Sequence, residues 1–178
     1  MMYKEKQVEE KAIINAASRI CAAARTAPKA RGIDNIITLV LTGAEKDTLA
    51  NKMDEISNRE FEGTTNIFPR DAKNLRAAQA LVLIGVEKAY AGLKFCSFCG
   101  FENCDQCKKA GGRCAYDMIN LGIALGSAVS IAVDDRIDNR IMYSIGKAAM
   151  EMDYADASVV WFGIPISLSG KNIFFDRK

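Results

Sequence analysis

The sequence predicts an α+β fold, in which a small central sheet is covered by helices. Two short apolar segments, residues 36–41 and 80–86, have the β-branched or continuously apolar character of strands. Around them run longer stretches in which apolar residues recur every three or four positions, as in amphipathic helices. The elements lack a regular βαβ rhythm and no G-x-G-x-x-G motif is present, so we do not expect a doubly wound sheet.

Length and composition fit one globular domain over residues 1–178. The chain has 178 residues, of which 49% are hydrophobic and 26% charged. A net charge of +2 gives no reason to expect a concentrated basic face, so nucleic acid is not an expected partner. The first residues are charged and develop no secretory pattern, which predicts a cytoplasmic location.

Three helices are expected in the first half of the chain, over residues 4–24, 44–61 and 69–78. The first should end within TAPKARG, because Pro28 disfavours a helical conformation at the residue before it. The third should start at Pro69, since proline is tolerated in a first helical turn. The run ALVLIGV at residues 80–86 predicts a strand buried on both faces.

Residues 118–133 predict a nearly all-apolar helix, with Asp117 as its cap or first-turn acid. This uncharged run is 16 residues long, shorter than the roughly 20 that a membrane span needs, so we expect a core helix and no membrane association. Gly122 and Gly126 cost helix stability and so suggest close approach of another backbone or a ligand, with tight helix packing the favoured explanation. An amphipathic helix over residues 138–152, a last strand over 157–162 and an irregular tail that packs on the body or on a second subunit complete the prediction.

Five of the six cysteines fall within residues 95–114, FCSFCGFENCDQCKKAGGRC, at C-x2-C-x4-C-x2-C-x6-C spacing. We expect residues 94–115 to form a cysteine-rich metal or cluster loop inserted before the apolar helix. In a reducing compartment clustered thiols are more often metal ligands or catalytic groups than disulfides, and five is an odd number. The candidate metal ligands are Cys96, Cys99, Cys104, Cys107 and Cys114.

Zinc, an iron–sulfur cluster and a metal-free redox loop are the alternatives for these thiols. Zinc knuckles of the C-x2-C type are usually about 12 to 20 residues apart, whereas only four residues separate Cys99 from Cys104. Cys99-x4-Cys104-x2-Cys107 matches the first three ligands of the plant-type two-iron pattern, and Cys96 or Cys114 would supply the fourth. We therefore favour a cluster, around which the loop could fold tightly at Gly100, Gly111 and Gly112.

The chain contains no histidine, which excludes every mechanism that needs an imidazole. Serine and cysteine hydrolases with a histidine base, histidine zinc sites and Rieske-type clusters are all ruled out. Chemistry here must come from a cofactor, from thiols, or from Asp, Glu, Lys and Tyr.

Four segments, FCSFCGFENCDQC, INLGIALGSAVSIA, DNRIMYSIGKAA and GIPISLSGKNIFFDR, resemble a family of uncharacterised proteins that contain a ferredoxin domain. The resemblance runs over most of the chain, residues 4–177. It implies a cysteine-ligated cluster and no established substrate.

A further segment, AAARTAPKARGIDN, is similar to the opening of the flavin-dependent nitroreductase fold, where the first helix ends in an Ala-Pro turn beside FMN. This similarity implies a nitroreductase-like fold, FMN as a further cofactor, and an intertwined homodimer. By position, the residues implied to contact the FMN phosphate or ring are Arg25, Lys29 and Arg31.

The leading hypothesis is a cytoplasmic redox protein with a cysteine-ligated iron–sulfur cluster. It would exchange single electrons with an unidentified partner, and with a flavin in the same polypeptide if one is bound. The alternatives are a zinc-stabilised binding module and a flavin-dependent oxidoreductase without a cluster.

Overall fold

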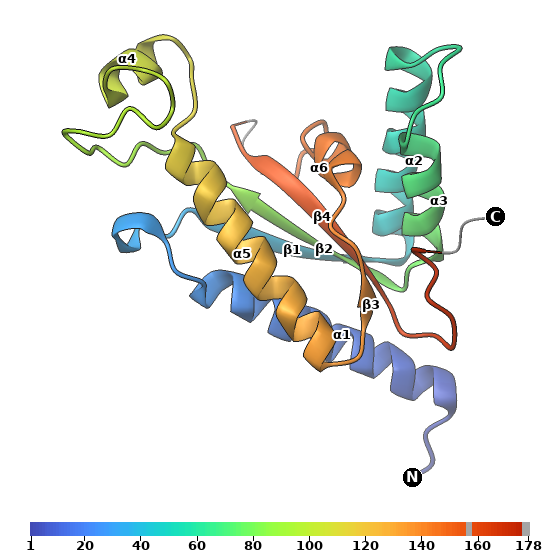
Figure 1. The fold of residues 1–178 in the computed structure, drawn as a ribbon. Coiled ribbons are helices and arrows are strands. Elements are labelled where there is room, and N and C mark those ends of the chain that lie inside the picture. Colours follow the sequence, from blue (N-terminus) through green and yellow to red (C-terminus); the bar gives the residue numbers. More distant parts are fainter. Residues whose placement is uncertain (156–157, 176–178) are drawn as a thin grey trace.

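The computed structural model describes residues 1–155 and 158–175, and it has the predicted α+β class (Figure 1). One antiparallel sheet has the strand order β1-β2-β4-β3. Its strands are β1 (Ile36–Thr42), β2 (Ala80–Val86), β3 (Asp138–Asn139) and β4 (Val160–Ser167). The helices are α1 (Glu5–Thr26), α2 (Gly43–Glu60), α3 (Phe68–Ala77), α4 (Cys104–Lys109), α5 (Ala115–Asp134) and α6 (Tyr143–Ala149), with a short 3-10 turn, η1 (Ala30–Gly32), after α1.

Helices cover both faces of the sheet, so the protein has two hydrophobic cores. Figure 1 shows α1 and α5 crossing one face, while α2, α3 and α6 lie over the other. Because side chains alternate along a strand, β2 contributes to both cores. Val82 and Ile84 pack in the α1/α5 core, whereas Leu81 and Leu83 pack in the α2/α3/α6 core. All seven residues of β2 are buried, as the continuous apolar run predicted.

The elements of the first half lie within two residues of their predicted ends. Ala27, just before Pro28, has extended backbone angles and ends α1. Pro69 stands in the first turn of α3, as expected. These agreements follow from strong local signals: helical periodicity, a proline at a helix boundary and an uninterrupted apolar strand.

α5 begins at Ala115, three residues earlier than predicted, and Asp117 lies in its first turn. By length and composition α5 is apolar enough to cross a membrane. Its buried residues, among them Leu121, Ala124 and Ala128, pack in the core that it shares with α1 and the sheet. That packing is the one expected of a core helix.

The prediction of tight packing at the α5 glycines is wrong within this chain. A Cβ added to Gly122 or to Gly126 would meet no atom within 4 Å. The close contacts to α1 are made instead by alanines and by Ser127, whose hydroxyl donates a hydrogen bond to the carbonyl oxygen of Ala23 over 3.0 Å. Both glycines therefore lie on an open face of α5.

The predicted helix over residues 138–152 is also wrong in its first part. Asp138 and Asn139 form β3, which pairs with Ser167 and Ile166 of β4. Helix α6 starts only at Tyr143, after an isolated bridge between Met142 and Gly163. Pairing with β4 thus overrides the local helical pattern, which carries no information about distant partners.

The last strand starts later and runs further than predicted, over Val160–Ser167 instead of 157–162; residue 157 lies outside the described residues. The segment GIPIS was expected to belong to the irregular tail, but it is part of β4 and contains Pro165. Amide groups alternate sides along a strand, so the nitrogen of Pro165 faces the same side as that of Gly163, toward β3. The β3–β4 pairing covers only Ser167 and Ile166, so no strand hydrogen bond is needed at Pro165.

Beyond β4, Ile173 and Phe174 pack on the α2/α3/α6 core, as expected for a tail that covers the body.

Candidate functional site: the cysteine loop

The segment between β2 and α5 carries all five clustered cysteines. It leaves the sheet after Val86, contains the short helix α4 and returns at Cys114, the residue that precedes α5. Asn103 caps α4 by accepting a hydrogen bond from the backbone N–H of Gln106 over 2.9 Å. In Figure 1 this segment projects beyond one end of the sheet, next to the start of α5.

Four of the five thiols line a single cavity. Cys96, Cys99, Cys104 and Cys114 line a small cavity of about 10 Å³, together with Phe101 and other residues of the loop. Cys107 is fully buried and hydrogen-bonds to Cys99, but it is not part of the cavity lining. Every cysteine of the chain is a free thiol. The structure thus brings together the residues that the sequence proposed as metal ligands, with Cys107 next to Cys99 but outside the cavity lining.

Neighbouring thiols and burial change the acidity of Cys107. Burial raises the pKa of its thiol, and so do the adjacent Cys99, Cys114 and Cys104. Like charges close together disfavour ionisation, so the group as a whole would hold thiolates only if a cation compensated them.

The separation of the thiols bears on which metal group they suit. Four thiolates on one tetrahedral zinc lie about 3.8 Å apart. Among residues 1–155 and 158–175, no three His, Cys, Asp or Glu side chains lie close enough to share a single ion. As placed in the described residues, the thiols therefore do not surround a single ion.

Glycines allow the tight course of the loop, as predicted. Gly100 and Gly111 have φ values of 82° and 71°, which side-chain-bearing residues rarely adopt. A Cβ at Gly112 would lie 2.9 Å from the sulfur of Cys107 and 2.8 Å from the ring of Phe101. The buried position of Cys107 thus depends on the missing side chain at residue 112.

Several hydrogen bonds fix the loop to the body. The ammonium of Lys88 donates to the carbonyl oxygen of Gly111 over 2.9 Å, and the hydroxyl of Tyr90 donates to that of Gly112 over 3.0 Å. Arg113 donates to the carbonyl oxygen of Ser158, just before β4. The two ends of the cysteine segment are therefore held against the edge of the sheet.

Each basic residue proposed for FMN has a partner within the protein. Arg25 forms an ion pair with Asp34 at 2.7 Å. The ammonium of Lys29 is buried and donates to the carbonyl oxygens of Ala24 and Arg25, which caps the end of α1. Arg31 donates to the carbonyl oxygen of Ala91. As placed, these three side chains hold the α1–β1 turn together and do not form an open phosphate site, so flavin contact by them stays a prediction.

The pair of Arg25 and Asp34 should make stability depend on pH. Partial burial acts to raise the pKa of Asp34, but the hydrogen bonds from Arg25 and from the backbone of Ile36, with the charge of Lys29, lower it overall. A carboxyl with a lowered folded-state pKa stabilises the fold above its unfolded pKa of about 3.9 and loses that effect as the pH falls through the folded value.

Replacing Arg25 with glutamine should therefore lower the free energy of unfolding at pH 7 by no more than about 1 kcal/mol, because solvent screens this half-exposed pair. The difference from the unmodified protein should shrink at acid pH, as the pH falls through the folded-state pKa of Asp34 and the carboxyl becomes protonated in both states. Urea unfolding at the two pH values measures this. An equal loss of unfolding free energy at both pH values would show that the ion pair between Arg25 and ionised Asp34 is not the cause of the loss.

The site also contains a polar network that sequence reasoning missed. The side-chain amide of Asn35, just before β1, donates to the carbonyl oxygen of Glu87 over 3.1 Å and to Asp117 over 3.2 Å. Asp117 also accepts from the backbone N–H of Ala89 over 3.1 Å. Burial raises the pKa of Asp117, and the hydrogen bond from Ala89 and the charge of Arg113 partly offset it. The sequence did contain one sign of this network: Asp117 and Asn120 stand three residues apart at the start of a largely apolar helix.

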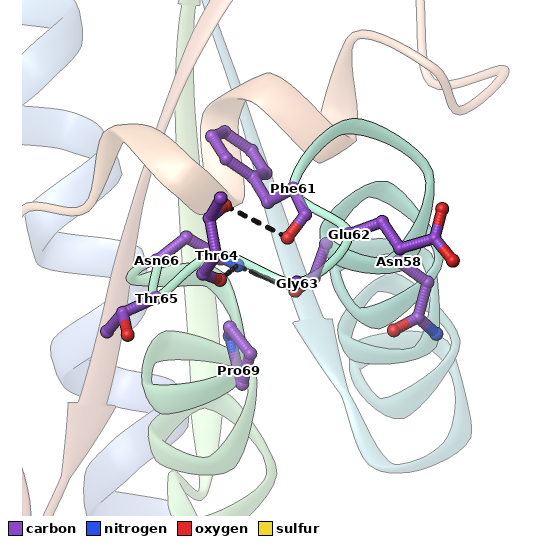
Figure 2. Close-up of a pocket in the computed structure, with 9 residues that line it drawn as sticks. Asn58, Phe61, Glu62, Gly63, Thr64, Thr65, Asn66 and Pro69 are labelled. Carbon is purple, nitrogen blue, oxygen red and sulfur yellow. Dashed lines mark hydrogen bonds between the residues drawn. The ribbon is translucent and has the colours of Figure 1, made fainter.

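A larger cavity lies elsewhere, with a volume of about 700 Å³. Figure 2 shows it at the α2–α3 turn, with a lining that includes Asn58, Phe61 and Thr65. It contains no cysteine and its lining is polar, with the Thr64 hydroxyl donating to the carbonyl oxygen of Phe61. Figure 1 places this turn far from the cysteine loop. Its size alone gives it no chemistry, so the site is assigned to the thiols.

Comparison with other proteins identifies the family. Residues 110–177 match a family described as "Uncharacterized protein containing a ferredoxin domain". An uncharacterized protein from Archaeoglobus fulgidus is 42% identical over 185 aligned positions, which cover 99% of this chain and 98% of that protein. The chain belongs to this family. Of the five clustered cysteines of this ferredoxin-domain protein, only Cys114 falls within the matched range, so the roles of the other four rest on the geometry above.

Solved structures resemble the ferredoxin-domain protein in fold alone. A putative nitroreductase in complex with FMN from Desulfovibrio desulfuricans has a TM-score of 0.60 at 15% identity, covering 92% of this chain and 78% of that one. A nitroreductase with bound FMN from Desulfitobacterium hafniense has a TM-score of 0.59 at 11% identity, with coverages of 96% and 81%. NfrA1 of B. megaterium has a TM-score of 0.58 at 12% identity, and the alignment spans 93% of this chain but only 61% of NfrA1. The predicted nitroreductase-like fold is confirmed.

Proposed function

We propose that this protein is a cytoplasmic redox protein whose cysteine loop holds an iron–sulfur cluster. The observation that carries the proposal is that Cys96, Cys99, Cys104 and Cys114 line one cavity. The ferredoxin-domain family and a fold shared with flavin oxidoreductases support a role in electron transfer. The cytoplasmic location fits free thiols, which persist in a reducing compartment.

In this proposal the cluster ligands are the four cysteines that line the cavity, and Cys107 supports the loop without binding iron. When bound, the cluster would supply one-electron chemistry. The chain's own residues hold the thiols in place: Asn103 caps α4, Lys88 and Tyr90 anchor the turn at residues 111–112, and Phe98 stacks on Tyr116 with ring centroids 5.9 Å apart. A fixed thiol geometry lowers the reorganisation needed when a cluster binds or changes charge.

Metal and sulfide analysis after anaerobic purification tests the proposal. We expect brown protein that bleaches with dithionite and contains iron and acid-labile sulfide in comparable amounts. Colourless protein with stoichiometric zinc would show a structural metal site instead and would overturn the redox assignment.

Flavin binding is a second candidate, which only the fold of the solved structures favours. Since Arg25, Lys29 and Arg31 already have protein partners, we assign no step to FMN. Boiling the purified protein and measuring the fluorescence of the supernatant distinguishes the cases, because released FMN fluoresces and released iron does not.

We further propose that the protein forms a homodimer through the open face of α5. Met118, Ile119 and Ile123 are each about two-fifths exposed, and Gly122 and Gly126 leave room between them. Apolar side chains separated by glycines make a flat surface on which a second backbone can approach closely.

Replacing Ile123 with glutamate should weaken this dimer at least about tenfold, because a charge would be buried without a partner. Sedimentation equilibrium measures the effect. Ile141→Glu is the matched control, since Ile141 is similarly exposed but lies between β3 and α6. A monomeric unmodified protein, or equal dissociation in both variants, would count against an α5 interface.

A further inference from the structure

The cysteine loop carries the two most exposed aromatic side chains of the described residues. Phe95 is fully exposed and Phe98 is 69% exposed, and they stand on either side of Cys96 in the run Phe95-Cys96-Ser97-Phe98. A single exposed apolar side chain is ordinary, but two large ones this close together are typical of an interaction site. Neither ring packs in the two hydrophobic cores, so the fold itself does not explain them.

Phe98 is held in place although it is mostly exposed. Its ring stacks on Tyr116 in the first turn of α5, with centroids 5.9 Å apart and an interplanar angle of 25°. Phe95 makes no ring contact within residues 1–155 and 158–175. Because both rings lie at the surface, a partner can bury them without rearranging the core, which keeps the cost of binding low.

The two rings lie beside the thiols that reach the surface. Cys96, Cys99 and Cys104 are partly exposed, whereas Cys107 and Cys114 are buried. The rate of electron transfer falls steeply with distance, so a redox partner has to contact the loop near the partly exposed thiols. Phe95 adjoins Cys96 in the chain, and the whole segment projects beyond the sheet, where a partner can approach it (Figure 1).

The charge of the loop favours an acidic partner. Residues 94–115 contain four basic and two acidic residues, which gives this loop a net charge of +2. The whole chain has the same net charge, so its remaining residues are balanced. Lys94, Lys108 and Lys109 are exposed and form no ion pair within the described part of the chain. Their charges are therefore available to carboxylates of another protein.

We infer that the projecting cysteine loop is the docking surface for an acidic redox protein, an inference that rests on the proposed electron-transfer function. Phe95 and Phe98 supply the apolar contact, and the three lysines supply the complementary charge. Weak redox encounters bury less than about 1,200 Å² in total. Two phenylalanines at roughly 150 Å² each, with the matching surface of the partner, account for about half of that area. A second copy of the same loop is a poor partner, because it carries like charge.

Isothermal titration calorimetry with two redox proteins of opposite charge tests the surface. The probe is an acidic plant-type ferredoxin, and a basic cytochrome c is the control. The full chain, purified anaerobically, should bind the ferredoxin, and at least about tenfold more weakly when the salt concentration rises from about 20 to about 300 mM. A bound cluster adds negative charge to the loop, so the salt dependence also reports the net sign. Affinity that rises with salt, or a preference for cytochrome c, would overturn the inference.

Phe95→Ser should weaken ferredoxin binding at least about tenfold. It should leave iron and acid-labile sulfide per chain unchanged, because Phe95 packs against no other ring. Phe175→Ser is the matched control: Phe175 is 58% exposed and follows β4, in a segment that Figure 1 shows across the molecule from α4. Equal binding by the Phe95 variant and the unmodified protein would overturn the docking surface.

Lys109→Glu tests the charge and still applies if Phe95→Ser loses its sulfide. This variant should bind the ferredoxin more weakly at low salt and show a smaller dependence on salt. Lys73→Glu on α3 is its control, since Lys73 is also exposed but lies far from the loop (Figure 1). Equal effects of the two lysine changes would count against a contact at the loop. Dissociation of a homodimer by Phe95→Ser in sedimentation equilibrium would assign the rings to a contact between copies and overturn the inference.

A failed cluster and a failed docking surface are distinguishable. Ferredoxin binding that Phe95→Ser weakens, in protein without acid-labile sulfide, would refute the cluster and keep the docking surface. Sulfide without ferredoxin binding would refute the docking surface and keep the cluster.

Discussion

Replacing Cys104 with serine is expected to remove most of the bound iron and sulfide. Cys104 lines the thiol cavity, and loss of one of four thiolates leaves a cluster iron without its ligand. We expect acid-labile sulfide per chain to fall at least about tenfold after anaerobic purification, since even changes outside the ligand shell cost roughly ten- to a hundredfold in metal affinity.

Cys107→Ser provides the decisive comparison. Cys107 is buried and bonded to Cys99 but does not line the cavity, and a serine hydroxyl can keep that hydrogen bond. It should therefore retain most of the cluster, as should Cys21→Ser on α1, far along the chain from the loop. Loss of sulfide in both Cys104→Ser and Cys107→Ser would show that the ligand set is the sequence-based run of Cys99, Cys104 and Cys107, not the cavity lining.

Gly146→Ala is expected to destabilise the fold more than any other glycine-to-alanine change considered. A Cβ at this position would lie 1.8 Å from the carbonyl oxygen of Trp161, which is backbone and cannot rotate away. Helix α6 would have to move off β4, and so open the α2/α3/α6 core. We expect a loss of at least about 3 kcal/mol, which for a chain of this size lowers the melting temperature by roughly 6–12 °C.

Gly170→Ala is the control for this prediction. A Cβ at Gly170 meets no atom within 4 Å, and the residue does not have a positive φ. Its melting temperature should stay within about 2 °C of that of the unmodified protein, because surface changes without special backbone geometry are usually within about 0.5 kcal/mol. Equal stability of the two variants would mean that α6 does not approach β4 as closely as described.

Local patterns determined how far the fold could be predicted. α1, α2, α3, β1 and β2 were predicted because each is defined by its own periodicity or composition. β3 and the second half of β4 were not, because they depend on distant partners: Asp138 lies opposite Ser167, and residues 163–166 lie opposite β2. The short length of β3 explains why Pro165 is tolerated within β4.

The candidate site, too, could be predicted from the sequence only in part. The thiols are close in sequence, so their spacing was enough to group them, yet it could not show that Cys107 lies outside the cavity lining. The polar network of Asn35, Ala89 and Asp117 is brought together only by the fold. The outward direction of Gly122 was likewise invisible, because a helical glycine faces a neighbour or solvent according to tertiary packing.

The position of the cysteine segment has a consequence for how the chain can vary. It begins after Val86, the last paired residue of β2, where Ile36 and Val160 also end their pairing. Deleting one residue within β2 would exchange the side chains of the two cores, because every following residue would turn to the opposite face. Insertions or deletions between residues 87 and 114 leave that alternation untouched. Relatives should therefore be able to lengthen, shorten or lose the cysteine segment while they keep the sheet. The sheet and the cysteine segment can then evolve at different rates.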